Sequence, residues 1–223
     1  MELSLGNLAD FAEVEKLLCV LKNDSRREVD YLFFKCVFEA LQRNSTSVSS
    51  LCAQLRKQTQ SEIVIKFVQG WLLFHKGERK SSRKVLEDLY GILRVSQELS
   101  LLETVSLEEG LLLLSKILLD DKKLDNGLCV VEFLCLSNSK FLRGWELYGD
   151  YLTKRHNTKD ATSCYERCQD IGPAVLYKLA SGYCAEGMYM KCVNLYLCHD
   201  SIMVRDEIYD LCKSKLFMDI HGL

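Results

Sequence analysis

The sequence predicts an all-helical protein built from stacked helical hairpins, and three observations support this fold class. One proline and twelve glycines in 223 residues are too few for an all-β chain, which needs such residues at its many turns. With 48% hydrophobic and 27% charged residues, the chain can bury a core and does not have the composition of a disordered segment. A spacing of small and large side chains also recurs at intervals near 34 residues. We therefore expect about eleven to thirteen helices and no sheet.

The clearest repeat runs from Leu142 to Pro173. Small and large side chains occur in it at fixed offsets, namely Trp145, Tyr148, Gly149, Leu152, Ala161, Tyr165, Cys168 and Pro173. A small residue lets the first helix of a pair lie close to the second, large residues fill the groove beside it, and a proline is expected to end the second helix. The pattern resembles the tetratricopeptide (TPR) pattern W-x2-L-G-x2-Y, followed by A-x3-F and a closing proline.

The same template, a small residue followed 12, 16 and 19 positions later by packing residues, fits at four further places. In chain order these are Cys36, Val48, Cys52 and Leu55; Gly70, Ser82, Leu86 and Leu89, with Trp71 beside the small position; Ser115, Gly127, Val131 and Leu134; and Ala180, Cys192, Tyr196 and His199. The resemblance implies a right-handed α-solenoid of about five TPR-like hairpins, in which neighbouring units stack to make one continuous core.

We expect a single solenoid domain over residues 1–223. An amphipathic spacing predicts an N-terminal capping helix, and it involves Leu8, Phe11, Val14, Leu17, Leu18 and Leu21. The predicted order is this cap in 1–28, repeats one and two in 29–96, an insertion in 97–107, repeats three to five in 108–200 and a C-terminal cap in 201–223.

The cysteines favour a reducing compartment. Their number, eleven, is odd, and no pair has C-x-x-C spacing. Several sit in apolar runs, where a free thiol behaves as a small buried hydrophobe: Cys36, Cys52, Cys129, Cys135 and Cys192. The sequence therefore predicts a cytoplasmic protein, with the nucleus as the alternative. The N-terminus does not resemble a signal peptide, and Leu111–Leu119 is too short to span a bilayer, so no membrane association is expected.

No catalytic arrangement is recognisable, and the sequence predicts neither an enzyme, nor a cofactor or metal site, nor a small-molecule substrate. None of the four histidines shares a helix face with a second ligand at metal spacing. Cys198 and His199 are adjacent, so on a helix they point in different directions, and Cys198 is interpreted as core. The acid pairs Glu108–Glu109 and Asp120–Asp121 fall near predicted helix ends. An unrecognised enzyme remains the third hypothesis.

The first hypothesis is a binding or adaptor protein within a larger assembly, holding a protein partner in a concave groove. The resemblance places Phe67, Trp71, Glu146 and Asp150 on the groove side of the first helices. In the TPR family, chaperone tails are held there by a set of cations. Such a set is missing from these positions, where Arg143 and Lys178 are interpreted as isolated cations.

The second hypothesis uses the turns inside the hairpins, which should line up along one edge of the solenoid. The proposed basic ridge consists of Lys76, Arg79, Lys80, Arg83, Lys84, Lys122, Lys123, Lys154, Arg155 and Lys159. The loops between repeats are expected to be acidic, through Glu98, Glu103, Glu108, Glu109 and Asp170. Lysine and arginine bind phosphates without reading sequence, so the ridge would suit a factor that inactivates translation by docking on a ribosome or other structured RNA. The simpler alternative is that these cations are only solvated.

Overall fold

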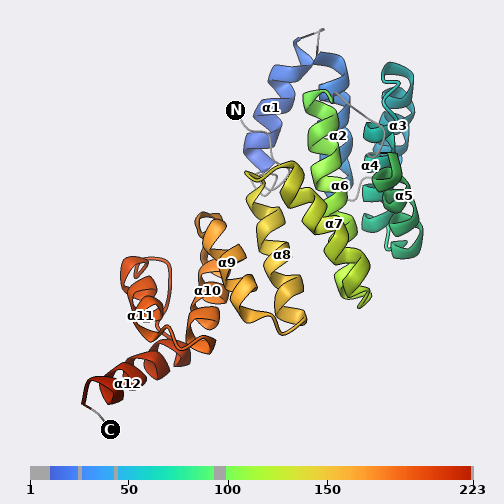
Figure 1. Ribbon diagram of the computed structural model, residues 1–223. Helices are drawn as coiled ribbons and strands as arrows, with labels where there is room; N and C mark the ends of the chain where they lie inside the picture. The colour runs from blue at the N-terminus through green and yellow to red at the C-terminus, as the bar shows by residue number, and fades with distance from the viewer. Residues whose placement is uncertain (1–10, 25–26, 43–44, 93–98, 222–223) are drawn as a thin grey trace. The chain divides into compact units, whose positions relative to one another are not determined.

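The computed structural model describes residues 11–24, 27–42, 45–92 and 99–221 (Figure 1). In these residues the chain forms twelve α-helices and no strand, which confirms the predicted all-α, TPR-like solenoid class. The bounds are α1 Phe11–Lys22, α2 Glu28–Leu41, α3 Ser45–Gln58, α4 Glu62–His75, α5 Arg79–Ile92, α6 Leu101–Asp120, α7 Leu124–Ser137, α8 Leu142–Lys154, α9 Thr158–Arg167, the 3₁₀ helix η3 Gln169–Ile171, α10 Pro173–Ala185, α11 Tyr189–Cys198 and α12 Glu207–His221.

The helices divide into two compact units, residues 1–117 and 118–223, and each is described by itself. Unit 1 holds α1 to α5 and most of α6, and unit 2 holds the end of α6 and α7 to α12. In both units, successive helices pack in pairs. Among the described helices, none combines the length and the apolar character that crossing a membrane requires.

Unit 1 is built on the hairpins α2–α3 and α4–α5, with α1 packed on α2. Gly70 of α4 lies so close to Leu86 of α5 that a Cβ on the glycine would stand 2.7 Å from the leucine side chain. The Ser82 hydroxyl donates a hydrogen bond to the Gly70 carbonyl at 2.7 Å. The core joins the two hairpins through the fully buried rings of Phe33 and Phe67, whose centroids are 5.7 Å apart.

Unit 2 repeats this close packing of a small residue against a large one. A Cβ on Gly149 of α8 would stand 2.5 Å from the Tyr165 ring of α9. In the same way Gly127 of α7 faces Tyr151 of α8. Ala161, Ala180 and Tyr196 are also buried, as core residues of consecutive hairpins. The spacing of small residues in the sequence therefore corresponds to real contacts between helices.

One turn recurs in both units and was not anticipated from the sequence. The second residue after the first helix of a hairpin has a positive φ, at Gly77 (85°), Lys122 (59°), His156 (60°) and Gly187 (72°). These positions are 45, 34 and 31 residues apart, the same intervals as those between Gly70, Ser115, Gly149 and Ala180. At each turn two backbone N–H groups cap the preceding helix, for example from His156 to Thr153 and from Asn157 to Leu152. This is the hydrogen-bond pattern of a Schellman cap.

The segment before the third repeat differs from the expectation of acidic loops. Residues 101–107 of the predicted insertion form the first part of α6, and 97–98 lie outside the described residues, as does Glu98. Glu108 and Glu109 lie in the middle of α6 rather than near a helix end, and Glu109 is buried. Glu103 is in the first turn of α6, where it accepts hydrogen bonds from Ser100 and from the Ser61 hydroxyl. The Ser61 bond is the largest cause lowering the pKa of Glu103.

Two other expectations about single residues were wrong. Pro173 does not end the second helix of its hairpin, because α9 already ends at Arg167 and the proline is the first residue of α10. That position suits proline, since an N–H there would have no partner inside the helix. Cys129 and Cys198 are exposed rather than core, because each lies on the outward side of a helix whose apolar face is turned inward.

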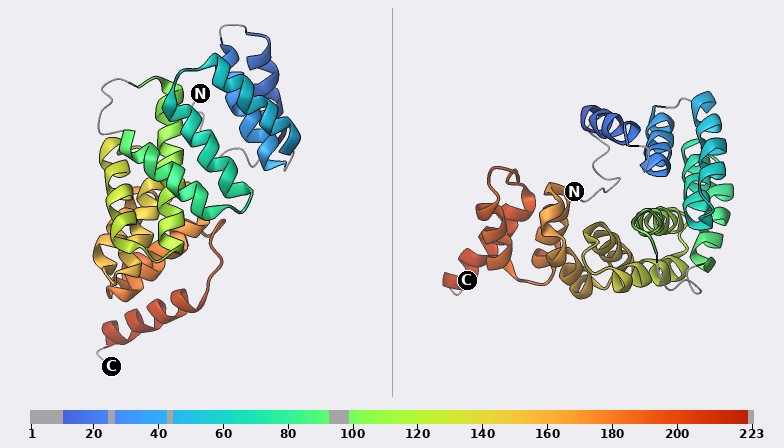
Figure 2. Two further views of the ribbon diagram at one scale, coloured as in Figure 1. Left: turned by 90° about the vertical axis from the view of Figure 1, so that its right-hand side faces the viewer. Right: turned by 90° about the horizontal axis from the view of Figure 1, so that it is seen from above.

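The terminal helices cover the neighbouring hairpins of their own units. Val14, Leu18 and Leu21 of α1 are buried as predicted, and Leu8 lies outside the described residues. At the other end an irregular connection leads into α12, the red helix in Figure 2. Helix α12 packs on α11 through Tyr209 and Cys212.

Candidate protein-binding surface

The basic residues of unit 1 gather at the turn between α4 and α5. Lys76 caps the end of α4, and Arg79, Lys80, Arg83 and Lys84 occupy the first two turns of α5. All are exposed except Arg83, whose guanidinium Nε lies 3.5 Å from a Glu87 carboxylate oxygen. The Arg79 guanidinium carbon lies 5.9 Å from the centre of the Phe74 ring. These five cations therefore form a local cluster on unit 1.

The basic residues of unit 2 occupy two neighbouring turns. Lys122 and Lys123 join α6 to α7. Lys154 is the last residue of α8, Arg155 follows it, and Lys159 is in the first turn of α9. Arg155 donates a hydrogen bond to Asp125 at the start of α7, at 2.6 Å. The structure thus brings the two turns together, and part of their positive charge is neutralised. Whether the clusters of units 1 and 2 make one ridge stays a prediction.

A second polar surface lies on unit 2, where α8 and α10 are neighbours; we call it the α8–α10 face. Lys178 of α10 donates hydrogen bonds to Glu146 at 2.9 Å and to Asp150 at 2.9 Å, both on α8. The side chains are 33%, 27% and 29% exposed respectively, so all three remain open to solvent. Lys178, which was interpreted as a cation outside any set of cations, is thus paired with two acids, a contact that was not predicted from the sequence.

The environment fixes the charge of this lysine. Burial alone would lower the pKa of Lys178, but the hydrogen bonds that its ammonium donates to Asp150 and Glu146 outweigh this effect, and the pKa is raised. Asp150 also accepts a hydrogen bond from the Tyr165 hydroxyl at 2.9 Å. Burial is the main reason why the pKa of Tyr165 is raised, so the tyrosine stays neutral. The face thus carries two carboxylates and one ammonium in a fixed arrangement.

The two aromatic residues expected to line a groove, Phe67 and Trp71, differ in exposure. Phe67 is fully buried, so its assignment to the groove was wrong; the Phe33 ring occupies the space beside it. Trp71 is partly exposed and its ring lies 4.0 Å from that of His75. Trp145 and Tyr148 are also partly exposed. Both lie on the side of α8 that faces α9, away from Glu146. The Arg167 guanidinium of α9 stacks over the Trp145 ring, with its carbon 4.3 Å from the ring centre.

The sequence offered one missed signal for the α8–α10 face. Lys178 lies 32 residues after Glu146 and 28 after Asp150, distances close to one repeat, so their helices occupy equivalent places in successive hairpins. No group of three or more histidine, cysteine, aspartate or glutamate side chains that could hold a metal ion was found among the described residues.

Solved structures with a similar arrangement of helices are TPR proteins. MamA of AMB-1 matches with a TM-score of 0.54 and 11% identity over 78% of this chain and 97% of that chain. The MamA RS-1 ArsTM double mutant matches with a TM-score of 0.55 and 12% identity, over 84% of this chain and 97% of that chain. YrrB, described as a TPR protein with an unusual peptide-binding site, matches with a TM-score of 0.51 and 13% identity, over 83% of this chain and 93% of that chain. Identities this low show a shared fold alone.

Sequence comparison gives the family. No curated protein matches the chain. The family described as the Tetratricopeptide repeat protein 21 C-terminal ARM domain matches residues 13–214. That range contains almost all of the hairpins described above, including both members of every small–large pair. The TPR-like resemblance read from the repeat is thereby confirmed, and the chain belongs to the family of the Tetratricopeptide repeat protein 21 C-terminal ARM domain.

Proposed function

We propose that this chain is a non-catalytic binding protein that holds a segment of a partner protein against the α8–α10 face, within a larger assembly. The observation that carries the proposal is the link from Lys178 to Glu146 and Asp150. It fixes the side chains of two successive first helices in one orientation while leaving them partly exposed. A surface ordered before binding loses less entropy when a partner docks, and repeat arrays commonly bind through such faces.

The charges on this face favour one kind of partner. The Lys178 ammonium already contacts two carboxylates, so it is a poor receptor for the carboxylate tail that other TPR proteins bind. The remaining lone pairs of Glu146 and Asp150 can accept hydrogen bonds from lysine, arginine or backbone N–H groups. YrrB, which has a similar fold, is described as binding a peptide. An extended segment with exposed donors is therefore the preferred partner.

Site-specific photo-crosslinking tests this proposal. A photoreactive amino acid replaces Ser181, which is exposed on α10 one turn after Lys178, and the full chain is irradiated in cells. We expect a recurrent adduct that disappears when Asp150→Arg is added, because the new cation repels donor groups. The matched control places the same photoreactive residue at Ser163, exposed on α9. The same adducts from both positions, or adducts insensitive to Asp150→Arg in a chain with normal circular dichroism, would contradict the proposal.

A second candidate function, docking on a ribonucleoprotein, has one specific observation in its favour. Arg79 and Lys80 stand in the first turn of α5, which contains no acidic residue. The positive end of the helix dipole disfavours cations there, so the ordinary preference of lysine for helix ends explains Lys76 but not these two. A helix N-terminus at which Arg79, Lys80, Arg83 and Lys84 outnumber the single acid Glu78 would attract a phosphate.

Salt dependence tests this second candidate. If the α4–α5 turn contacts phosphates, binding to purified ribosomes or structured RNA should fall by at least about tenfold between 50 and 200 mM salt. Reversing the charges of Arg79, Lys80, Arg83 and Lys84 should abolish it. Reversal of the exposed Lys213 and Lys215 on α12 is the control and should have little effect. Binding that is unaffected by salt or by the first reversal would exclude the candidate.

A further inference from the structure

Two cysteines of the first hairpin lie side by side. The sulfur of Cys36 on α2 is 3.3 Å from the sulfur of Cys52 on α3. Cys36 is fully buried and Cys52 is partly exposed. The two sulfurs of a disulfide are about 2.05 Å apart. A shift of little more than 1 Å, within reach of small side-chain rotations, would therefore allow a bond between the helices.

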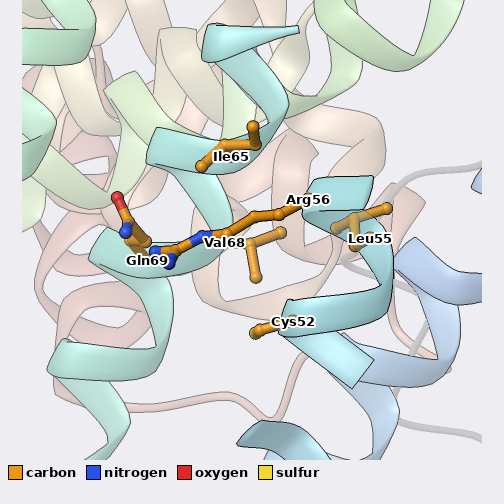
Figure 3. Close-up of a pocket in the computed structure, with 6 residues that line it drawn as sticks. All are labelled: Cys52, Leu55, Arg56, Ile65, Val68 and Gln69. Atoms are coloured by element: carbon orange, nitrogen blue, oxygen red, sulfur yellow. The ribbon is translucent and has the colours of Figure 1, made fainter. Parts of the chain in front are cut away.

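The partly exposed thiol opens on a small pocket between α3 and α4. Figure 3 shows the pocket lined by Cys52, Leu55, Arg56, Ile65, Val68 and Gln69, with the Arg56 side chain reaching from α3 towards Gln69 on α4. The enclosed part of the pocket has room for about one water-sized molecule, and the rest is open to solvent. Only a small reagent could therefore reach the Cys52 thiol through it.

The surroundings give the two thiols different acidities. The hydrogen bond from Cys36 lowers the pKa of Cys52; burial opposes this, and the positive charges of Arg56 and Lys76 add to it. The same hydrogen bond, with burial, raises the pKa of Cys36. Cys52 is thus the thiol that ionises and faces the pocket, while Cys36 keeps its proton behind it. A thiolate next to a second thiol is the arrangement that redox-sensitive cysteines require.

We propose that Cys36 and Cys52 form a redox-active dithiol, which a small peroxide oxidises to a disulfide between α2 and α3. The Cys52 thiolate attacks one oxygen of hydrogen peroxide, and the O–O bond breaks to leave a sulfenic acid and hydroxide, which is protonated to water. The sulfur of Cys36 then attacks the sulfur of Cys52. The S–O bond breaks, and the hydroxide leaves as water with the proton of Cys36. Two thiols are oxidised, and one peroxide is reduced to two waters.

Other cysteines of the chain provide internal references. Cys164 and Cys168 are also near each other, but the Cys168 thiol donates its hydrogen bond to the Cys164 carbonyl. Burial raises the pKa of Cys164 to about 11 and that of Cys168 to about 12. These two should remain thiols under mild oxidation. Cys198, which is exposed, shows the rate of an unassisted surface thiol.

The experiment is a peroxide time course on the full reduced chain, stopped with an alkylating reagent and analysed by mass spectrometry after trypsin. Trypsin separates the two cysteines into the peptides 36–43 and 44–56. We expect these peptides to become linked while Cys164 and Cys168 are alkylated. Cys52→Ser should abolish the link. Arg56→Gln should slow its formation severalfold, because fewer Cys52 side chains are ionised.

A second readout traps the sulfenic acid directly. With dimedone present, the wild-type chain should show little sulfenic acid on Cys52, because Cys36 consumes it, whereas Cys36→Ala should accumulate the dimedone adduct. Circular dichroism checks that the variant is folded. The proposal is overturned if Cys52 is oxidised no faster than Cys198, or if its sulfenic acid persists in the wild-type chain without a link to Cys36.

Discussion

The first hairpin of unit 1 and the α8–α9 hairpin of unit 2 use the same two positions, 16 residues apart, to bring their helices together. In α2–α3 they hold Cys36 and Cys52, whose sulfurs lie 3.3 Å apart. In α8–α9 they hold Gly149 and Tyr165, and the ring fills the space in which a Cβ would lie. Two medium side chains fill the same gap as one large side chain beside a glycine. The repeat therefore constrains the summed volume of the pair and leaves its chemistry free.

The largest expected effect comes from breaking the glycine–tyrosine pair. Gly149→Ala would place a methyl group 2.5 Å from the Tyr165 ring, so the helices must move apart. We expect the free energy of unfolding, measured in urea, to fall by about 2 kcal/mol. Gly91→Ala on α5 is the matched control, because nothing lies within 4 Å of its added Cβ. It should raise stability by up to about 1 kcal/mol; a loss there equal to that of Gly149→Ala would refute the packing argument.

A smaller effect on stability should come from replacing the cysteine pair of α2–α3 by a glycine and a large side chain. Cys52→Leu alone adds volume beside the buried Cys36, and Cys36→Gly alone removes it. The double variant recreates the pair found at Gly70 and Leu86. A double-mutant cycle in urea should give a favourable coupling of about 1 kcal/mol. Additive losses would mean that the two positions do not share one space.

The ion pairs between Lys178 of α10 and the acids of α8 should contribute still less to the free energy of unfolding. Lys178→Met leaves Glu146 and Asp150 facing each other without the ammonium. Because a third of the lysine side chain is exposed, we expect a loss of only about 0.5–1 kcal/mol.

The pH dependence of this loss has a defined sign. Since the pKa of Lys178 is raised in the folded chain, its contribution is fully present below the ordinary lysine pKa, near 10.4, and is lost as the pH rises through the folded value. Unfolding curves of wild type and Lys178→Met should therefore differ equally at pH 7 and 9 and converge only above that range. Convergence already at pH 8 would show that the ion pair is not the cause.

The comparison of hairpins also shows how far sequence reasoning could reach. The recurrence of small residues correctly placed Gly70, Gly149 and Ala161, because close helix packing depends on local side-chain volume. It could not give the rotation of one hairpin against the next, which decides that Lys178 meets Glu146 and Asp150. The template did pair Cys36 with Cys52, but only as packing residues. The lowered pKa of Cys52 could not be predicted, because it depends in part on Arg56 and Lys76, which the fold brings close.

Single-residue orientation was predictable only where the apolar period is strong. Cys129 and Cys198 were misassigned because a free cysteine is usually buried, whereas these two are exposed. The turn at Lys122 and His156 was not recognised because a positive φ is uncommon in residues other than glycine, although Gly77 and Gly187 hold the equivalent positions. The partner surfaces remain predictions, since charge alone does not specify what binds.

The central claim is that one type of hairpin builds both units, and that one type of turn closes the four hairpins at Gly77, Lys122, His156 and Gly187. The most direct test is urea unfolding of His156→Gly beside Gly187→Ala. An added methyl at Gly187 meets nothing within 4 Å, and φ is positive at both positions. His156→Gly therefore relieves backbone strain, and Gly187→Ala introduces it. We predict opposite signs: His156→Gly gains about 0.5–1 kcal/mol, and Gly187→Ala loses about 1 kcal/mol. Equal signs, or a loss for His156→Gly, would contradict the account.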